Sequence, residues 1–95
     1  MIYKISITQD DIDQGMIRDA SECPIARRLN KMFPGTSWLT VTPDSVRLSY
    51  DLPDGVAVYR ASFSRSATRF VHAFDKGMRD VQPFNFMLNL ERVNA

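Results

Sequence analysis

Residues 62–86 constrain the fold more than any other stretch, because they predict a helix followed by a tight turn and an alternating strand. Ser64 can cap the helix, and Gly77 can end it. Apolar residues recur between them at helical spacing: Ala67, Phe70, Val71 and Phe74. Apolar residues then occupy every second position, as in a half-buried strand: Phe84, Phe86, Leu88 and Leu90. We expect the aromatic residues of both segments to fix this helix against a sheet.

The opposite side of the same helix offers a candidate partner-binding surface. Its residues follow one another at separations of four, three and four, which places them on one helix face: Arg65, Arg69, His72 and Lys76. Arg60 and Arg79 flank this stripe. The next longest predicted helix carries Arg27, Arg28 and Lys31, which would extend the positive surface if the two helices packed side by side. An amphipathic helix also needs a solvated face, and we favour this purely structural interpretation of the stripe.

The N-terminal third predicts a strand and two helices. Residues 2–8 alternate, with Tyr3, Ile5 and Ile7 expected on the core face. Thr8 and Asp11 form a capping box for a short helix over 9–14, which would bury Ile12 and end at Gly15. The next helix starts at Ser21 or Cys23, since Pro24 is tolerated in a first turn. One apolar stripe follows before Pro34-Gly35 ends that helix: Ile25, Leu29, Met32 and Phe33.

The central part predicts a meander of three strands, over residues 37–42, 45–50 and 56–63. Tight turns at 42–44 and 52–55 connect them, the second because Pro53 and Gly55 suit a turn. The exposed sheet face would carry Arg47, Ser49, Asn85, Met87 and Asn89.

We therefore predict an α+β fold in a single domain over 1–95, in the order β-α-α-β-β-β-α-β. About five mostly antiparallel strands would form the sheet. Two main helices and the short one would pack on one of its faces. The order of the strands stays open, with the two terminal strands beside each other or beside the meander.

Length and composition narrow the class of protein. The chain has 95 residues, a net charge of +1 and one cysteine. A single modest core fits this length, and an internal disulfide is excluded. Apolar runs are too short for a membrane span, and no secretory signal is visible, so we expect no membrane association and a cytoplasmic location. The low net charge means that any binding to nucleic acid requires a local basic patch.

Three other candidate sites have structural alternatives that we prefer. Cys23 at a helix N-terminus could have a lowered pKa, but Asp19 and Glu22 would oppose a second negative charge. A metal site could be imagined among Asp10, Asp11, Asp13, Asp19 and Glu22, but the spacing lacks the pattern of a calcium loop. His72 is the single histidine, so a histidine-based metal cluster cannot form. We predict no metal, no cofactor and no catalytic residues.

Two stretches resemble small uncharacterised proteins of tailed bacteriophages and prophages. The first is Ile-Thr-Gln-Asp-Asp-Ile-Asp-Gln-Gly at 7–15, followed by Cys-Pro-Ile-Ala at 23–26. The second is Phe-Asp-Lys-Gly at 74–77, followed by Val81 and by Pro-Phe-Asn-Phe at 83–86. The resemblance covers both ends of the chain and leaves its middle unmatched. It implies a bacterial host cytoplasm and a role in infection, and it brings no catalytic residues.

These observations lead to one preferred function and two alternatives. We expect a non-enzymatic interaction module that binds a host or phage protein through the exposed helix surface or an open sheet edge. The first alternative is a nucleic-acid binder that uses the basic stripe Arg65, Arg69, His72 and Lys76. A weaker alternative is a small thiol-dependent enzyme that uses Cys23. Exposed strands also make a homodimer plausible.

Overall fold

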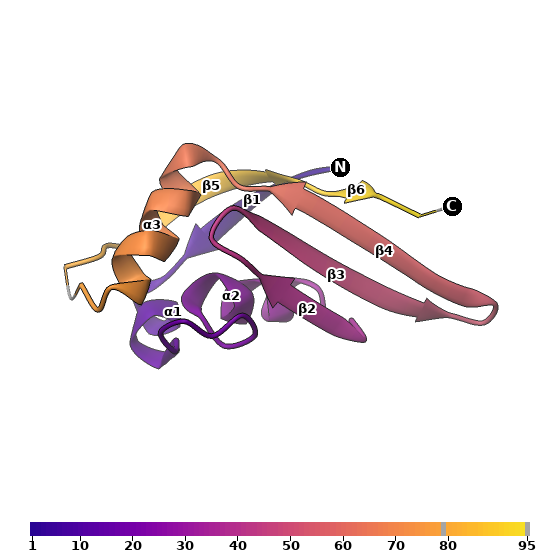
Figure 1. The fold of residues 1–95 in the computed structure, drawn as a ribbon, viewed down its shortest axis with the longest axis horizontal. Helices are drawn as coiled ribbons and strands as arrows, with labels where there is room; N and C mark the ends of the chain where they lie inside the picture. Colours follow the sequence, from indigo (N-terminus) through magenta and orange to yellow (C-terminus); the bar gives the residue numbers. More distant parts are fainter. Residues whose placement is uncertain (79, 95) are drawn as a thin grey trace.

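The computed structural model describes residues 1–78 and 80–94, and it confirms an α+β fold. The elements in chain order are β1 (Ile2–Ile7), α1 (Gln9–Gln14), α2 (Pro24–Met32), β2 (Trp38–Val41), β3 (Ser45–Leu52), β4 (Gly55–Ser62), α3 (Arg65–Asp75), β5 (Phe84–Asn89) and β6 (Glu91–Arg92). Figure 1 shows α3 at one end of the molecule and the turn between β3 and β4 at the other. No helix in the described part is long and apolar enough to cross a membrane.

Two helices begin at the predicted residue, and α2 begins with Cys23 as its cap, one of its two predicted starts. Thr8 and Asp11 form the complete capping box of α1, in which the Asp11 amide donates to Thr8 Oγ1 at 3.2 Å. Cys23 is the N-cap of α2, and its Sγ accepts a hydrogen bond from the Ala26 amide. Ser64 caps α3 in the same way through the Ala67 amide. Local hydrogen bonding therefore fixes where all three helices start.

The strands form two antiparallel sheets, whereas the sequence predicts one. β1 pairs with β5, and the second sheet has the order β2-β3-β4-β6. The C-terminal segment connects the two sheets. Its first strand, β5, pairs with β1, with Phe86 opposite Ile5, and its second strand, β6, pairs with β4, with Arg92 opposite Tyr59. The first strand and the last long strand thus pair with each other, which is one of the two arrangements that the sequence left open. The additional strand β6 was not predicted, because only two of its residues pair.

The β3–β4 hairpin makes the molecule long. Its principal extents are 45 × 22 × 18 Å, and the hairpin tip projects beyond the helices (Figure 1). The turn that contains Gly55 reverses the chain at a φ of 155°, which a side chain would strain. Leu52 and Val56 beside this turn are exposed. The outer half of the hairpin is therefore accessible on both faces.

One hydrophobic core connects both sheets with the helices. It takes the predicted inner positions of β1, α2 and α3, including Ile5, Leu29 and Phe74. α3 contacts β5 through Phe70 and Phe84, whose ring centroids are 4.8 Å apart. Phe63 in turn packs edge-on against Phe86 at 5.9 Å. The predicted packing of this helix on the last strand is confirmed.

Two burial predictions require correction. Ser49 was expected on the solvent-facing side but is fully buried, because Ser37 and the Trp38 strand next to it cover this position. Ile12 is only half-buried, and the fully buried residue of α1 is its neighbour Asp11. The other residues predicted on the exposed face are exposed: Arg47, Asn85, Met87 and Asn89.

Candidate functional site

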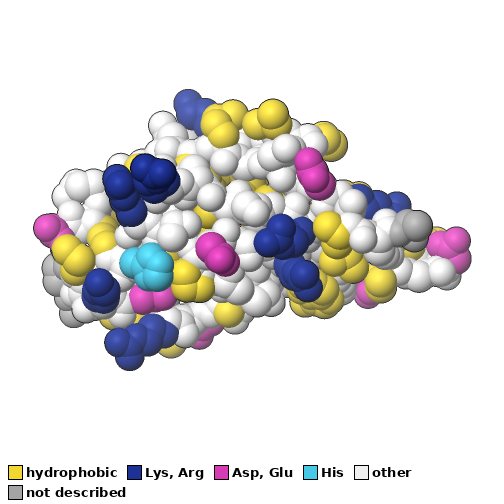
Figure 2. All heavy atoms as spheres, turned by 45° about the horizontal axis from the view of Figure 1, so that its top comes forward, with side chains coloured by type: hydrophobic (Ala, Val, Ile, Leu, Met, Phe, Trp, Pro, Cys, Tyr) yellow, Lys and Arg dark blue, Asp and Glu magenta, His cyan; other side chains and the backbone are white. Residues whose placement is uncertain are grey.

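The α3 basic stripe, defined as Arg65, Arg69, His72 and Lys76, lies on the solvent side of its helix. All four side chains are exposed, while the opposite face of α3 is buried through Ala67, Phe70, Val71 and Phe74. Figure 2 shows dark blue side chains around the cyan histidine at the end of the molecule that α3 forms. The structure therefore brings these four predicted residues together on one accessible surface.

The charges of this stripe are not balanced by acidic partners. In residues 1–78 and 80–94, none of the four side chains has a nitrogen within 4.0 Å of a carboxylate oxygen. Arg65 occupies the first helical position, and the first turn of α3 contains no acidic residue. The positive end of a helix dipole favours acidic side chains there, so helix stability gives no reason for this arginine. Of the flanking residues, Arg60 is exposed on β4, and Arg79 lies outside the described residues.

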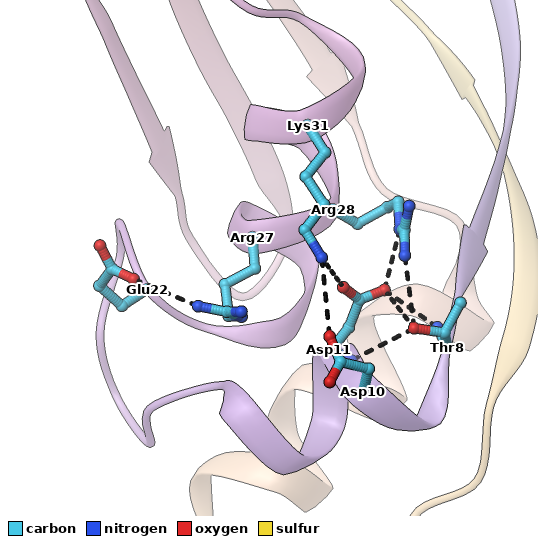
Figure 3. Close-up of polar contacts among 7 residues, drawn as sticks. All are labelled: Thr8, Asp10, Asp11, Glu22, Arg27, Arg28 and Lys31. Carbon is cyan, nitrogen blue, oxygen red and sulfur yellow. Dashed lines mark hydrogen bonds and ion pairs between the residues drawn. The ribbon is translucent and has the colours of Figure 1, made fainter.

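The cations of α2 behave differently from those of α3. Arg27 lies 3.9 Å from a Glu22 oxygen, and Arg28 Nε lies 2.9 Å from Asp11 Oδ2. Lys31 Nζ is 3.5 Å from Asp11 and 3.7 Å from Asp10. Figure 3 shows Arg28 and Lys31 directed to Asp11 between α1 and α2, and Arg27 directed to Glu22 at one side. The α2 cations therefore hold α1 and the following turn in place, and they do not extend the α3 basic stripe as an unpaired positive surface.

Asp11 is the centre of this ion cluster. Its side chain is fully buried and accepts hydrogen bonds from the Thr8 amide at 3.0 Å, the Thr8 hydroxyl at 3.0 Å and Arg28 Nε at 2.9 Å. Burial by itself raises the pKa of this carboxyl group, but the hydrogen bonds from Thr8 and Arg28 outweigh it, so the pKa of Asp11 is lowered. The second oxygen, Oδ1, has the Lys31 ammonium group as its nearest charge at 3.5 Å. A buried carboxylate in this setting stays ionised and joins two helices.

The remaining carboxylates of the predicted acidic group have local structural roles. Asp19 accepts hydrogen bonds at 2.9 Å from the amides of Ser21 and Glu22, and these bonds lower the pKa of Asp19. Asp13 accepts from Gln9 Nε2 at 2.9 Å on the surface of α1. Within the part of the chain that the structure describes, no three acidic, histidine or cysteine side chains are placed to hold a metal ion. These residues therefore shape the turn and α1.

Cys23 has an environment that disfavours the thiolate. The residue is buried, and burial raises the pKa of its thiol above the ordinary value. Hydrogen bonds from the Ala26 and Ile25 amides act in the opposite direction but are weaker, and the negative charges of Asp75 and Asp19 raise the pKa further. Nucleophilic cysteines require the reverse, an accessible thiol with a lowered pKa. The geometry supports a capping and packing role for this residue.

Two surface features escape the sequence-based reasoning. Arg47 and Arg60 stand directly opposite each other on the outer face of β3 and β4, although like charges in this position repel. The β2–β3 register places Trp38, which is 44% exposed, on the same face. The predicted turn at 52–55 pairs Leu52 with Gly55. Counting outward from this pair along both strands places Arg47 opposite Arg60, so the sequence could have predicted the arginine pair.

Comparisons with protein-family models, with curated proteins and with solved structures give no match for this chain.

Proposed function

We propose that this protein is a non-enzymatic interaction module that binds an acidic surface of a protein partner through the α3 basic stripe. The observation that supports this most directly is the contrast between the two longer helices. All three cations of α2 have carboxylates within ion-pair distance, whereas the α3 basic stripe forms no ion pair among the described residues. The one acidic residue of α3, the half-buried Asp75, accepts a hydrogen bond from the Arg18 amide. The resemblance to small phage proteins suggests a partner in the bacterial host cytoplasm.

The physical basis is electrostatic complementarity. An exposed single-sign surface accelerates the encounter with an oppositely charged partner and selects against like-charged ones. The α3 helix is a rigid support for such a surface, because its apolar side is anchored in the core through Phe70 and Phe74. Binding would bring carboxylates to a stripe of cations that forms no ion pair among the described residues.

The experiment is an affinity capture from nuclease-treated bacterial lysate with the wild-type chain and a charge-reversed variant, Arg65→Glu/Arg69→Glu. We expect the wild type to retain a protein that the variant loses, and we expect the captured complex to weaken as salt increases. Lys4→Glu is a matched control, because Lys4 is an exposed cation on β1, away from α3. If wild type, variant and control retain the same proteins, the α3 basic stripe is not the binding surface.

A nucleic-acid-binding function is the second candidate. It is favoured by the exposed Arg47–Arg60 pair with Trp38 nearby, since basic and aromatic side chains together suit single strands. Figure 2 shows dark blue side chains over this sheet as well as over α3, so a long anionic ligand could contact both. Retardation of a labelled single-stranded oligonucleotide should then decline steeply between 50 and 200 mM salt, roughly as expected when several phosphates are contacted. Absence of binding at the lower salt concentration would exclude this function.

A further inference from the structure

An aromatic cavity lies where the two sheets meet, on the inner side of the β3–β4 hairpin. It has a volume of about 170 Å³. Its wall contains four aromatic rings, which we call the aromatic cage: Tyr3 of β1, Phe33 after α2, Tyr50 of β3 and Tyr59 of β4. Leu48, Leu90 and Met1 complete the lining. Residues from opposite ends of the chain thus enclose one space.

The cavity exists because α2 is shorter than the hairpin that it accompanies. α2 ends at Met32, and Phe33 caps it immediately before Pro34 and Gly35 turn the chain away. The inner face of the hairpin continues past this point without a helix above it. Tyr50 and Tyr59 stand on this uncovered part and are half-buried.

The rings of the aromatic cage meet nearly at right angles. Tyr3 and Phe33 have centroids 5.0 Å apart at an interplanar angle of 90°, and Tyr50 and Tyr59 have centroids 6.4 Å apart at 85°. Perpendicular rings present both faces and edges to a shared space. Because ring faces carry negative potential, a cation that enters the cavity is attracted to each ring face that is not covered by the neighbouring ring.

The charges around the cavity determine which cation fits. Of the described residues, none with a carboxylate lines the cavity, and the N-terminal ammonium group of the lining residue Met1 is held by the Leu90 carbonyl oxygen at 3.1 Å. Burial and the neighbouring Tyr3 and Tyr59 raise the pKa of Tyr50, so its phenol is neutral at physiological pH. Arg92, the strand neighbour of Tyr59, is directed to Asn94, to which its Nε donates at 3.4 Å. A ligand here meets no carboxylate, and the side-chain acceptors of the lining are tyrosine hydroxyl groups, which disfavours the burial of a primary ammonium group.

The size of the cavity limits the part of a ligand that the aromatic cage can surround. Pockets for drug-sized molecules measure about 300–1,000 Å³, whereas an apolar cavity of about 150 Å³ holds a molecule as small as benzene. A cation whose charge is surrounded by methyl groups has a suitable volume, and the free energy of its transfer out of water is small for an ion. The ligand class that meets both conditions is a quaternary ammonium group.

We propose that the aromatic cage binds a quaternary ammonium group, carried either by a small molecule of the choline type or by a trimethylated lysine side chain. This site is separate from the α3 basic stripe and does not depend on the function proposed above. The rings supply cation–π attraction, and Leu48 and Leu90 contact the methyl groups. The side that the hairpin leaves uncovered gives the ligand access.

The test compares choline with its neutral isostere, in which a tert-butyl group replaces the trimethylammonium group, by NMR titration of the full chain. We expect choline to shift the ring resonances of the aromatic cage with at least about tenfold higher affinity than the isostere, because only the cation gains from the ring faces. Equal affinities of the two compounds would overturn the proposal. The absence of shifts from either compound at about 100 mM, a concentration that reveals even weak binding, would overturn it as well.

Variants locate the site and keep the test independent of folding. Tyr59→Leu should weaken choline binding at least about fivefold, whereas Tyr59→Phe keeps the ring and should retain the affinity within about twofold. If Tyr59→Leu does not fold, Tyr50→Leu and Tyr50→Phe form the same pair. The variant Arg65→Glu/Arg69→Glu should bind choline as the wild type does. Loss of affinity in the phenylalanine variants would show that the hydroxyl groups, and not the ring faces, bind the ligand.

Two further titrations distinguish the sources of the group. A short peptide with one trimethyllysine is compared with the same peptide carrying unmodified lysine. Preference for the methylated peptide over choline identifies a protein ligand, and choline binding without peptide binding identifies a small molecule. If neither the methylated peptide nor choline binds more tightly than its uncharged or unmethylated counterpart, the aromatic cage is not a quaternary ammonium site.

Discussion

Removing the buried carboxylate at Asp11 should destabilise the protein far more than removing any exposed carboxylate of the same helix. Asp11→Ala deletes the acceptor for the Thr8 amide and hydroxyl, and it leaves Arg28 without its partner at 2.9 Å. The Thr8 hydroxyl can still accept from the amide of residue 11, so half of the capping box survives. The contacts that remain between α1 with its cap and α2 are longer: Arg28 to the Thr8 hydroxyl at 3.3 Å and Lys31 to Asp10 at 3.7 Å.

The magnitude follows from the groups that lose their partners. A hydrogen bond to a charged group contributes about 1.5–3 kcal/mol, and a capping contact about 1 kcal/mol. Arg28 keeps 23% of its side chain exposed, so water can solvate the released guanidinium, and the 3–5 kcal/mol typical of a broken buried ion pair is an upper bound. Alanine regains about 0.5 kcal/mol through its helix propensity. We therefore expect Asp11→Ala to lower the free energy of unfolding by about 3 kcal/mol.

Urea unfolding followed by circular dichroism measures this difference. Asp13→Ala is the matched control, because Asp13 is an exposed carboxylate of the same helix, and its loss should stay within about 0.5 kcal/mol. A double-mutant cycle with Arg28→Ala should give a coupling energy of about 1–2 kcal/mol. Equal losses for the two aspartate variants would refute the central position of Asp11.

The pH dependence of stability provides an independent check. The pKa of Asp11 is lowered in the folded state, so its contribution is present above the unfolded-state pKa of about 3.9 and disappears as the pH falls through the folded value. The stability difference between wild type and Asp11→Asn should be constant between about pH 6 and 7 and should shrink below about pH 4. A difference that grows towards low pH would contradict the ionised state of this carboxyl group.

Three other substitutions or modifications test the core and the turns. Phe74→Ala should cost about 3–5 kcal/mol in urea unfolding, because the ring is 8% exposed, and a near-neutral change would contradict its burial. Gly15→Ala should cost about 1–3 kcal/mol, since a Cβ at this position would lie 2.6 Å from the ring of Pro24, and an unchanged unfolding midpoint would show that the ring can move aside. Alkylation of Cys23 at neutral pH should be at least about tenfold slower in the folded protein than in urea, because the thiol is buried with a raised pKa, and equal rates would reverse this assignment.

Much of the fold could be predicted because its signals are local. Thr8, Cys23 and Ser64 each satisfy free amides at a helix start, and this chemistry depends on residues within three positions. The alternation of Phe84, Phe86 and Leu88 likewise fixes which side of the last strand faces the core. Ser49 shows the limit of such patterns, since its burial results from Ser37 and Trp38 on a neighbouring strand.

The candidate site divides in the same way. Helical spacing alone places Arg65, Arg69, His72 and Lys76 on one face of α3, and their exposure is confirmed. The partners of Arg28 and Lys31 could not be predicted, because Asp11 reaches them only through the packing of α1 on α2. Charge pattern predicts a surface within one helix, and it gives no information on which surfaces of different helices meet.

The sequence by itself determined the helices, their caps, the faces of the strands and the solvent-facing cations of α3, because each depends on neighbours within about four positions. Only the tertiary structure decided that the last strand joins two sheets, that Asp11 is buried between two cations and that four aromatic rings enclose one cavity. The physical reason is that these features arise from side chains far apart in the sequence, such as Tyr3 and Tyr59, and the whole core sets the distance between them.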